Sequence, residues 1–306
     1  MKKFAALFPG QGSQSIGMGS EFFAESKLAK ELFSQADKAL GFSLSKLCLE
    51  GPIEELTLTQ NAQPAILTVS YICFLESELQ PTAAAGHSLG EYSALVAAKA
   101  ISFEDAVVLV HKRGCYMQEA VPQGAGKMIA VMGSSTEQIL QAIAEVPNEV
   151  VEVANYNSPG QTVVAGSTNG IDLFSQKVVA MSGKVIPLNV SAPFHCSLMK
   201  PAADKLELDL KATSINNPIF PVYSNVTAKA MKEASEVREL LVRQVTSSVR
   251  WTELVLNMTQ EQDLKTTVEF GTGGVLTKLG KRIDGSLERM EISDPKSLTT
   301  TRAALS

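Results

Sequence analysis

The chain has 306 residues, of which 45% are hydrophobic and 19% are charged, and its formal net charge at pH 7 is −5. These values are typical of a globular protein that buries a sizeable core. The negative charge, without a basic run interleaved with aromatic residues, excludes a general nucleic-acid-binding surface.

The cysteines and the amino terminus bear on the compartment. Cys48, Cys73, Cys115 and Cys196 show no C-x-x-C spacing, so we expect neither a zinc site nor a disulfide framework. A Pro-Gly pair cuts off the short apolar run at the start before it could form a signal peptide, and no apolar stretch has the length of a membrane span. We therefore expect a cytoplasmic protein with no membrane partner.

A strand, a glycine-rich loop and a helix follow one another three times. Residues 4–8 predict a strand that enters the loop PGQGSQSIGMG and then a helix over 21–40. The same order recurs over 82–98 around GHSLG and over 266–283 around GTGG. Such repeats are typical of an α/β protein with a parallel sheet, whose sites lie at the carboxyl ends of the strands.

The pattern changes over 126–192. This block predicts a strand, a helix, two strands, a helix and a strand, at 127–133, 134–146, 149–156, 161–167, 169–183 and 184–190. The βαββαβ order is ferredoxin-like. We expect a small ferredoxin-like domain over 126–192, inserted into a parallel-sheet, α/β-hydrolase-like large domain of 1–125 and 193–306. The polar segment after 285 predicts a strand and then a loose tail.

The second glycine-rich loop holds a candidate nucleophile. Ser88 lies between Gly86 and Gly90, after a predicted strand and before a predicted helix. The G-x-S-x-G motif alone arises by chance in roughly one chain in ten of this length. The strand, the tight turn and the small neighbours are what a nucleophile elbow requires. We interpret Ser88 as a nucleophile, with a purely structural turn as the alternative.

A serine nucleophile needs a base, and the chain has three histidines. His87 is adjacent to Ser88, so its side chain should point away from the hydroxyl and support the elbow. His111 falls inside a predicted helix, where a surface role fits. His195 lies in the motif SAPFHC, in backbone that Pro193 keeps non-helical. By elimination, His195 is the predicted base.

No acid stands out as the third member of a triad. The acids weighed for that role fall on predicted helices or in the small domain: Asp105, Glu119, Glu145, Glu149, Glu152 and Asp172. Either a backbone carbonyl or an amide side chain is the third member, or the serine–histidine pair differs from an esterase triad.

Two backbone amides are candidates for an oxyanion hole. Leu89 follows the serine and supplies one N–H group, and Gln11 in the first glycine-rich loop supplies the other. The alternative for this loop is a dinucleotide-binding fingerprint. That alternative fails because Ser15 occupies the third glycine position and no second strand with a terminal acid follows.

A predicted helix capped by Ser102 carries an arginine on its apolar face. Ala106, Val110, Arg113 and Met117 recur at helical spacing. Arg113 could pair with a structural acid or extend its head to solvent. The sharper interpretation is a receptor for a substrate carboxylate, because an unpaired buried guanidinium is costly. It predicts an acyl group with a free acid at its far end.

Nearly the whole chain is covered by a series of motifs that each occur once. In order along the chain they are FPGQGSQ (8–14), GHSLGEY (86–92), Arg113, NYNSPGQTVVAG (155–166), APFHC (192–196), YSNVTA (223–228) and QVTSSVRW (244–251). Together they resemble the malonyl-CoA:acyl-carrier-protein transacylases of fatty-acid and polyketide synthesis. The resemblance implies a ping-pong reaction without metal or other cofactor. Ser88 takes malonate from a coenzyme A thioester, and the phosphopantetheine thiol of acyl carrier protein takes it from Ser88.

The resemblance also implies residue roles. A backbone carbonyl near Gln244 would orient His195, and Gln11 and Leu89 would form the oxyanion hole. Phe194, which is typical of malonyl-preferring members, would line the substrate pocket with His87. The family's usual Gly-Pro-Gly is replaced by GTG at 271–273, which bears on the shape of that loop.

Three further amides, Asn155, Asn157 and Gln63, also fit family positions. We expect structural roles for them because amides at strand ends commonly tie loops.

An acidic carrier protein would be repelled by a chain of net charge −5 unless positive charge is local. Lys278, Lys281 and Arg282 follow the GTGG loop and, with Lys184, form a candidate docking patch; a solvated helix face is the alternative. Other functions stay open: a hydrolase of carrier-protein thioesters, a trans-acting polyketide acyltransferase, or a silent docking domain. Arg113 argues against the hydrolase.

Overall fold

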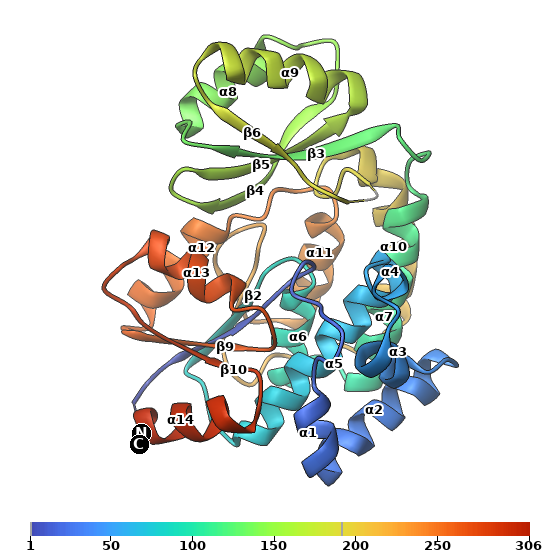
Figure 1. Cartoon of the computed structure of the whole chain (residues 1–306), viewed down its shortest axis with the longest axis vertical. Helices are drawn as coiled ribbons and strands as arrows, with labels where there is room; N and C mark the ends of the chain where they lie inside the picture. The colour runs from blue at the N-terminus through green and yellow to red at the C-terminus, as the bar shows by residue number, and fades with distance from the viewer. Residues whose placement is uncertain (1, 191) are drawn as a thin grey trace.

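Two β-sheets, one mainly parallel and one antiparallel, organise the computed structural model, which describes residues 2–190 and 192–306 (Figure 1). The larger sheet has the strand order β10-β9-β1-β2-β7-β8. Its strands are β1 (Ala5–Phe8), β2 (Ala83–Gly86), β7 (Val222–Tyr223), β8 (Ala230–Met231), β9 (Thr266–Phe270) and β10 (Glu288–Ile292). β10 to β7 are parallel and β8 is antiparallel at the edge, which confirms the α/β prediction.

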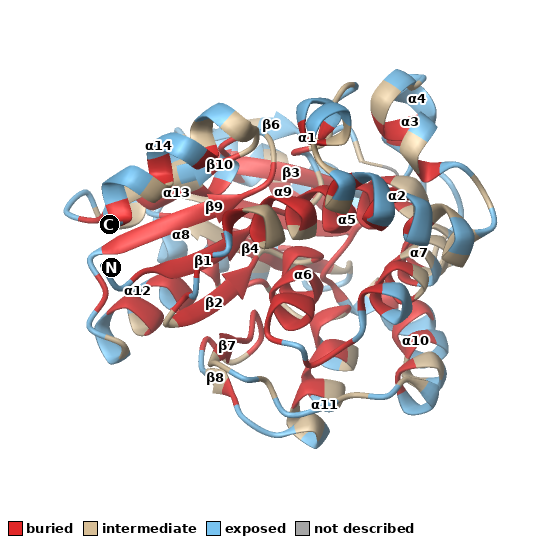
Figure 2. Ribbon diagram, turned by 90° about the horizontal axis from the view of Figure 1, so that it is seen from below, coloured by how far each residue is buried: buried red, intermediate tan, exposed pale blue. Residues whose placement is uncertain are grey.

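Helices surround the larger sheet. They are α1 (Ser20–Glu25), α2 (Lys27–Leu40), α3 (Leu44–Glu50), α4 (Ile53–Leu56), α5 (Thr59–Ser77), α6 (Gly90–Ala97), α7 (Phe103–Glu119), the 3-10 turn η1 (Ser197–Met199), α10 (Lys200–Ala212), α11 (Ala234–Gln244), α12 (Trp251–Glu261), α13 (Val275–Ile283) and α14 (Pro295–Leu305). Strands β1, β2 and β9 are buried, whereas α2, α10 and α14 expose their outer faces (Figure 2). The core therefore lies on the sheet and under the inner faces of the helices.

The single helix predicted over 21–40 is divided in two. Ser26 separates α1 from α2, and its hydroxyl accepts a hydrogen bond from the amide of Ala29 at 3.1 Å. A serine in this position caps a new helix, because its side chain satisfies an amide that the first turn leaves without a partner.

The small sheet carries the predicted βαββαβ order. Its elements are β3 (Gly126–Met132), α8 (Thr136–Ala144), β4 (Val151–Ser158), β5 (Gln161–Ser167), α9 (Thr168–Ala180) and β6 (Lys184–Pro187). The strand order is β4-β5-β3-β6, all antiparallel, with α8 and α9 on the face turned away from the larger sheet (Figure 1). This confirms the ferredoxin-like class, although β6 ends at Pro187 and not at 190. We keep 126–192 as the proposed bounds of the inserted unit.

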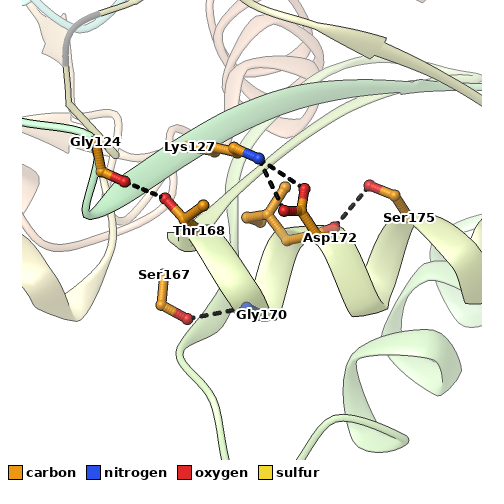
Figure 3. A network of polar contacts seen from close by, with 8 residues as sticks. Gly124, Lys127, Ser167, Thr168, Gly170, Asp172 and Ser175 are labelled. Atoms are coloured by element: carbon orange, nitrogen blue, oxygen red, sulfur yellow. Dashed lines mark hydrogen bonds and ion pairs between the residues drawn. The ribbon is translucent and has the colours of Figure 1, made fainter.

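Polar contacts fasten α9 to its sheet (Figure 3). Lys127 on β3 forms an ion pair with Asp172 on α9, with both carboxylate oxygens at 2.8 Å from Nζ. Thr168 Oγ1 donates to the carbonyl of Gly124 at 2.6 Å, and Ser167 Oγ caps α9 by accepting from the amide of Gly170 at 3.1 Å. These contacts occupy Asp172, one of the acids weighed for the triad.

The predicted loose tail is wrong. After β10, residues Pro295–Leu305 form α14. Asp294 caps this helix: Oδ1 accepts from the amide of Ser297 at 2.7 Å, while Ser297 Oγ accepts from the amide of Asp294 at 3.1 Å. Leu298 and Leu305 then bury against the core, which makes the last turns part of the fold.

Across residues 2–190 and 192–306, none of the helices combines the length and the apolar character that crossing a bilayer demands.

Candidate active site

A strained turn at the end of β2 presents Ser88. This residue has a φ of 51°, which a non-glycine residue rarely adopts. Close packing of the flanking glycines explains the turn. A Cβ atom at Gly86 would lie 1.9 Å from the backbone of Gly90, and one at Gly90 would lie 2.0 Å from the carbonyl oxygen of Phe8. The Ser88 amide donates to Asn225 Oδ1 at 2.7 Å, which holds the turn in place.

His195 lies in hydrogen-bond contact with the serine. Ser88 Oγ is 2.7 Å from His195 Nε2, and His195 Nδ1 is 2.9 Å from the backbone carbonyl oxygen of Gln244. Because a carbonyl can only accept, Nδ1 carries the ring proton and Nε2 is free to accept from the hydroxyl. Burial, and then the charge of Arg113, lower the pKa of His195 to about 3, so the imidazole is a neutral base.

The acids weighed for the triad have other partners. Their contacts in the described chain are Asp105 with Ser102, Glu119 with Lys205, Glu145 with Lys177, Glu149 with Ser167, Glu152 with Ser197, and Asp172 with Lys127. The atom that faces Nδ1 is the Gln244 carbonyl oxygen. Of the alternatives that the sequence left open, the geometry therefore favours a backbone carbonyl as the third member.

The first glycine-rich loop lies beside the elbow because β1 and β2 are parallel neighbours, with Phe8 opposite Gly86. Both loops line a cavity of about 250 Å³, and Gln11, Ser88 and Leu89 contribute to its wall. Within residues 2–190 and 192–306, the backbone amides of Gln11 and Leu89 donate a hydrogen bond to no protein atom. Two amides are thus available to a substrate oxygen next to the nucleophile.

Arg113 is only 2% exposed and lies in the same cavity. Its Nη1 donates to Gln63 Oε1 at 2.6 Å, and its Nη2 donates to Gln244 Oε1 at 3.0 Å and to Ser88 Oγ at 3.1 Å. The guanidinium carbon also lies 5.5 Å from the centre of the Tyr92 ring. Burial lowers the pKa of Arg113, but a guanidinium keeps its charge in proteins. In the described chain no carboxylate pairs with it directly, which leaves a buried cation beside the nucleophile.

Sequence reasoning missed a buried network behind the elbow. Glu91 Oε2 accepts from the backbone amide of Asn225 at 2.9 Å and from Gln244 Nε2 at 2.8 Å. Gln244 Nε2 also donates to the Ser88 carbonyl at 2.9 Å, and Asn225 Nδ2 donates to the Gly86 carbonyl at 2.7 Å. Burial raises the pKa of Glu91 to about 7. The available signal was that Glu91, Asn225 and Gln244 each fall inside one of the motifs GHSLGEY, YSNVTA and QVTSSVRW.

The remaining predicted residues fall into two groups. His87 and Phe194 line the cavity, and His87 points away from the hydroxyl, as expected, with Nε2 at 2.8 Å from Asn157 Oδ1. This contact gives Asn157 the expected structural role of tying the small sheet to the elbow. His111 lies elsewhere, where its Nδ1 donates to the carbonyl of Gln60 at 2.8 Å.

Gln63 lies within α5 and not at a strand end, and it is buried in the cavity wall, where its Oε1 accepts a hydrogen bond from Arg113 Nη1. Asn155 also lines the cavity, and its backbone bridges β4 to Val249 in the larger domain.

Basic side chains gather beside the cavity. Lys278, Lys281 and Arg282 are exposed on α13, which also contributes to the cavity wall. Arg282 Nη1 donates to Gln161 Oε1 at 2.9 Å. Met132 on β3 pairs with Gln161 on one side and with Lys184 on the other. Lys184 therefore lies two strand spacings, about 10 Å, from Gln161 and at the same end of the small sheet. The structure thus brings all members of the predicted patch to one side.

Known proteins share this chain's sequence and fold. The family model described as "Acyl transferase domain" matches residues 6–293. The malonyl CoA-acyl carrier protein transacylase of Bacillus subtilis is 47% identical over 304 residues, covering 97% of this chain and 96% of that protein. The protein of the same name from Haemophilus influenzae is 45% identical over 312 residues, with both chains fully covered.

Solved structures agree. A malonyl-transacylase in complex with its type II PKS acyl-carrier protein superposes with a TM-score of 0.96 at 42% identity, over 99% of this chain and 100% of that one. A Vibrio cholerae acyl carrier protein S-malonyltransferase gives a TM-score of 0.96 at 41% identity, over 98% and 100% of the two chains. The chain therefore belongs to the acyl transferase family and, within it, to the malonyl-CoA:acyl-carrier-protein transacylases.

Proposed function

We propose that this enzyme transfers a malonyl group from malonyl-CoA to the phosphopantetheine thiol of acyl carrier protein, through a malonyl ester on Ser88. The observation that carries the proposal is Arg113, a buried cation whose Nη2 lies 3.1 Å from the Ser88 hydroxyl. A cation in this position recognises an acyl group that ends in a carboxylate, because the fork of a guanidinium matches the two carboxylate oxygens.

The first half-reaction loads the enzyme. Ser88 Oγ attacks the thioester carbonyl of malonyl-CoA while His195 Nε2 takes its proton, over the 2.7 Å contact already present. The Gln244 carbonyl holds the ring and stabilises the imidazolium. The amides of Gln11 and Leu89 stabilise the oxyanion. His195 then gives the proton to the departing sulfur of coenzyme A.

The second half-reaction reverses the roles. The pantetheine thiol gives its proton to His195 and attacks the ester carbonyl, and Ser88 leaves and regains the proton. Serine, histidine and amide donors are sufficient for acyl transfer between two thiols, so the proposal involves no metal and no other cofactor. The basic patch of Lys278, Lys281, Arg282 and Lys184 is the proposed docking surface for an acidic carrier protein.

Two choices within this proposal concern pathway and compartment. One relative, 40% identical over 93% of this chain, is named for polyketide biosynthesis, whereas others are named as transacylases without a pathway, so extender units for fatty-acid or for polyketide synthesis fit the proposal. We propose the cytoplasm as the compartment, because the four cysteines are free thiols, as in proteins of reducing compartments.

A hydrolase of carrier-protein thioesters is the competing function. One assay separates the two: labelled malonyl-CoA is incubated with the enzyme and phosphopantetheinylated carrier protein, and the products are resolved. We expect malonyl-carrier protein with wild type and none with Ser88→Ala. Free malonate released from pre-formed malonyl-carrier protein, with no malonyl group transferred from malonyl-CoA to carrier protein, would establish the hydrolase instead.

A further inference from the structure

A carboxylate that the reaction scheme does not use lies behind the nucleophile. Glu91 on α6 is fully buried, and its Oε2 accepts from the backbone amide of Asn225 and from Gln244 Nε2. Its other oxygen, Oε1, has no hydrogen-bond partner in the described chain. Oε1 is therefore the oxygen that can take a proton without breaking a hydrogen bond.

One carboxamide links this acid to the acyl-selecting cation. Gln244 Oε1 accepts from Arg113 Nη2 at 3.0 Å, and Gln244 Nε2 donates to Glu91 Oε2 at 2.8 Å. The dipole of the Gln244 carboxamide is therefore oriented with its oxygen towards the positive Arg113 and its N–H towards the carboxylate of Glu91. As a carboxylate, Glu91 balances the charge of Arg113 in the empty site, since the guanidinium's own hydrogen bonds are to uncharged oxygens.

This balance changes when malonate is loaded. The proposed substrate brings a second carboxylate to Arg113, so two negative charges then share one buried positive charge. A nearby like charge favours the neutral form of an acid. These three groups are neutral together only if one of the two acids is protonated. Because the malonyl carboxylate is the acid in direct contact with Arg113, the proton goes to Glu91.

We propose that Glu91 is a positioning residue whose charge depends on whether an acyl group with a carboxylate is bound. It balances Arg113 as a carboxylate in the empty enzyme and takes up a proton when a malonyl carboxylate occupies Arg113. The inference rests on the proposed function, because it requires an acyl group with a free acid.

The other ionisable groups around Glu91 do not take this role. Arg113 from α7 keeps its charge, and burial raises the pKa of Tyr92, so this phenol stays neutral. His87 and His195 both have pKa values lowered by burial. Burial raises the pKa of Glu91 itself to about 7, which leaves it mostly ionised at pH 8 and able to gain a proton.

The loading step itself neither consumes nor releases a proton, because serine and thioester become ester and thiol. Any proton uptake therefore reports a group of the enzyme. At pH 8 we expect net proton uptake, up to one proton per malonyl group loaded, and none with acetyl-CoA, which releases the same thiol but brings no carboxylate. The sign also fixes the pH dependence: since loading takes up a proton, the malonyl-to-acetyl ratio of kcat/KM should fall as pH rises from 7 to 9.

The test measures proton uptake with an indicator dye in weak buffer, normalised to acyl-enzyme counted by intact mass. The variants are Glu91→Gln, which keeps an acceptor oxygen, and Glu269→Gln as a matched control. Glu269 is equally buried, but it accepts from the amides of Leu276 and Thr277 at the start of α13. We expect uptake in wild type and Glu269→Gln, and no uptake and a flat malonyl-to-acetyl ratio in Glu91→Gln.

Uptake that persists in Glu91→Gln would assign the proton to another group and overturn the inference. So would a wild-type enzyme that loads malonyl without any uptake, a result that holds even if Glu91→Gln does not fold. Failure of the proposed function looks different, because then the mass spectrum of wild type shows no malonyl-enzyme at all.

Discussion

Replacement of Arg113 by alanine should separate malonyl transfer from acetyl transfer. The guanidinium is 2% exposed and donates only to uncharged oxygens in the described chain, so the malonyl carboxylate would meet a desolvated cation that lacks a direct anionic partner. Removing one side of such a buried charge pair costs about 2–5 kcal/mol. The expected loss in kcat/KM for malonyl-CoA is therefore ~30- to ~5,000-fold.

Acetyl transfer should lose less. The acetyl group makes no use of the guanidinium fork, and what it loses is the hydrogen bond from Nη2 to Ser88 Oγ at 3.1 Å. A hydrogen bond from a charged donor contributes about 1.5–3 kcal/mol, so we expect a loss of ~10- to ~150-fold, smaller than the malonyl loss because malonyl transfer loses both this bond and the carboxylate pair. Arg113→Lys should recover only part of malonyl transfer, because one ammonium cannot reach both Gln63 and Gln244 as the fork does.

The assay is kcat/KM for malonyl-CoA and acetyl-CoA in wild type, Arg113→Ala and Arg113→Lys, with circular dichroism to establish folding. Lys112→Ala is the matched control, since Lys112 is the neighbouring cation on α7 but is exposed and paired with Asp209. It should leave both activities unchanged. If a folded Arg113→Ala loses both activities in equal proportion, Arg113 is structural and the argument from its charge is refuted.

Three other predictions concern the base, the docking patch and the elbow. Because burial lowers the pKa of His195 to about 3, kcat/KM for acetyl-CoA should stay level from pH 8 to pH 5, where an ordinary imidazole keeps only ~3% of its neutral form; a fall centred near pH 6.5 would contradict this. Charge reversal of Lys281 and Arg282 should raise KM for carrier protein ~10-fold and leave KM for malonyl-CoA unchanged, whereas equal effects on both would remove the docking role. Gly90→Ala should abolish activity and lower the free energy of unfolding by about 1–3 kcal/mol, because its Cβ would lie 2.0 Å from a backbone oxygen at the end of β1; Gly285→Ala, with its nearest atom at 4.0 Å, is the control in denaturant titrations.

The reacting groups could be predicted because each has a local signal. The glycines around Ser88, the elimination among three histidines and a cation on an apolar helix face are all visible within short segments. In the structure Ser88, His195 and Arg113 meet in one cavity. The parallel sheet and the βαββαβ order were predictable for the same reason, since strand and helix periods are local properties.

The network behind the elbow could not be predicted, because it depends on contacts between distant segments. Asn225 reaches Glu91 across 134 residues, and Gln244 reaches Ser88 across 156. Their roles are fixed only once β7 pairs with β2 and α11 packs near α6. A single sequence shows these residues as ordinary amides and an acid in a helix.

The terminal helix was missed for a different reason. Its threonine-rich sequence has a weak apolar pattern, which favoured a loose tail. The start signal was present, since Asp294, Pro295 and Ser297 form a capping box with proline in the first turn. Two buried leucines then outweigh the low helix propensity, so tertiary packing decides the outcome.

The central claim is that Ser88 carries the acyl group, and intact mass spectrometry tests it most directly. Wild type incubated with malonyl-CoA, without carrier protein, should gain the mass of one malonyl group, which peptide mapping places on Ser88. Adding phosphopantetheinylated carrier protein should remove that mass and leave malonyl-carrier protein. Ser88→Ala should show no gain, and a malonyl group that persists on Ser88→Ala would contradict the account.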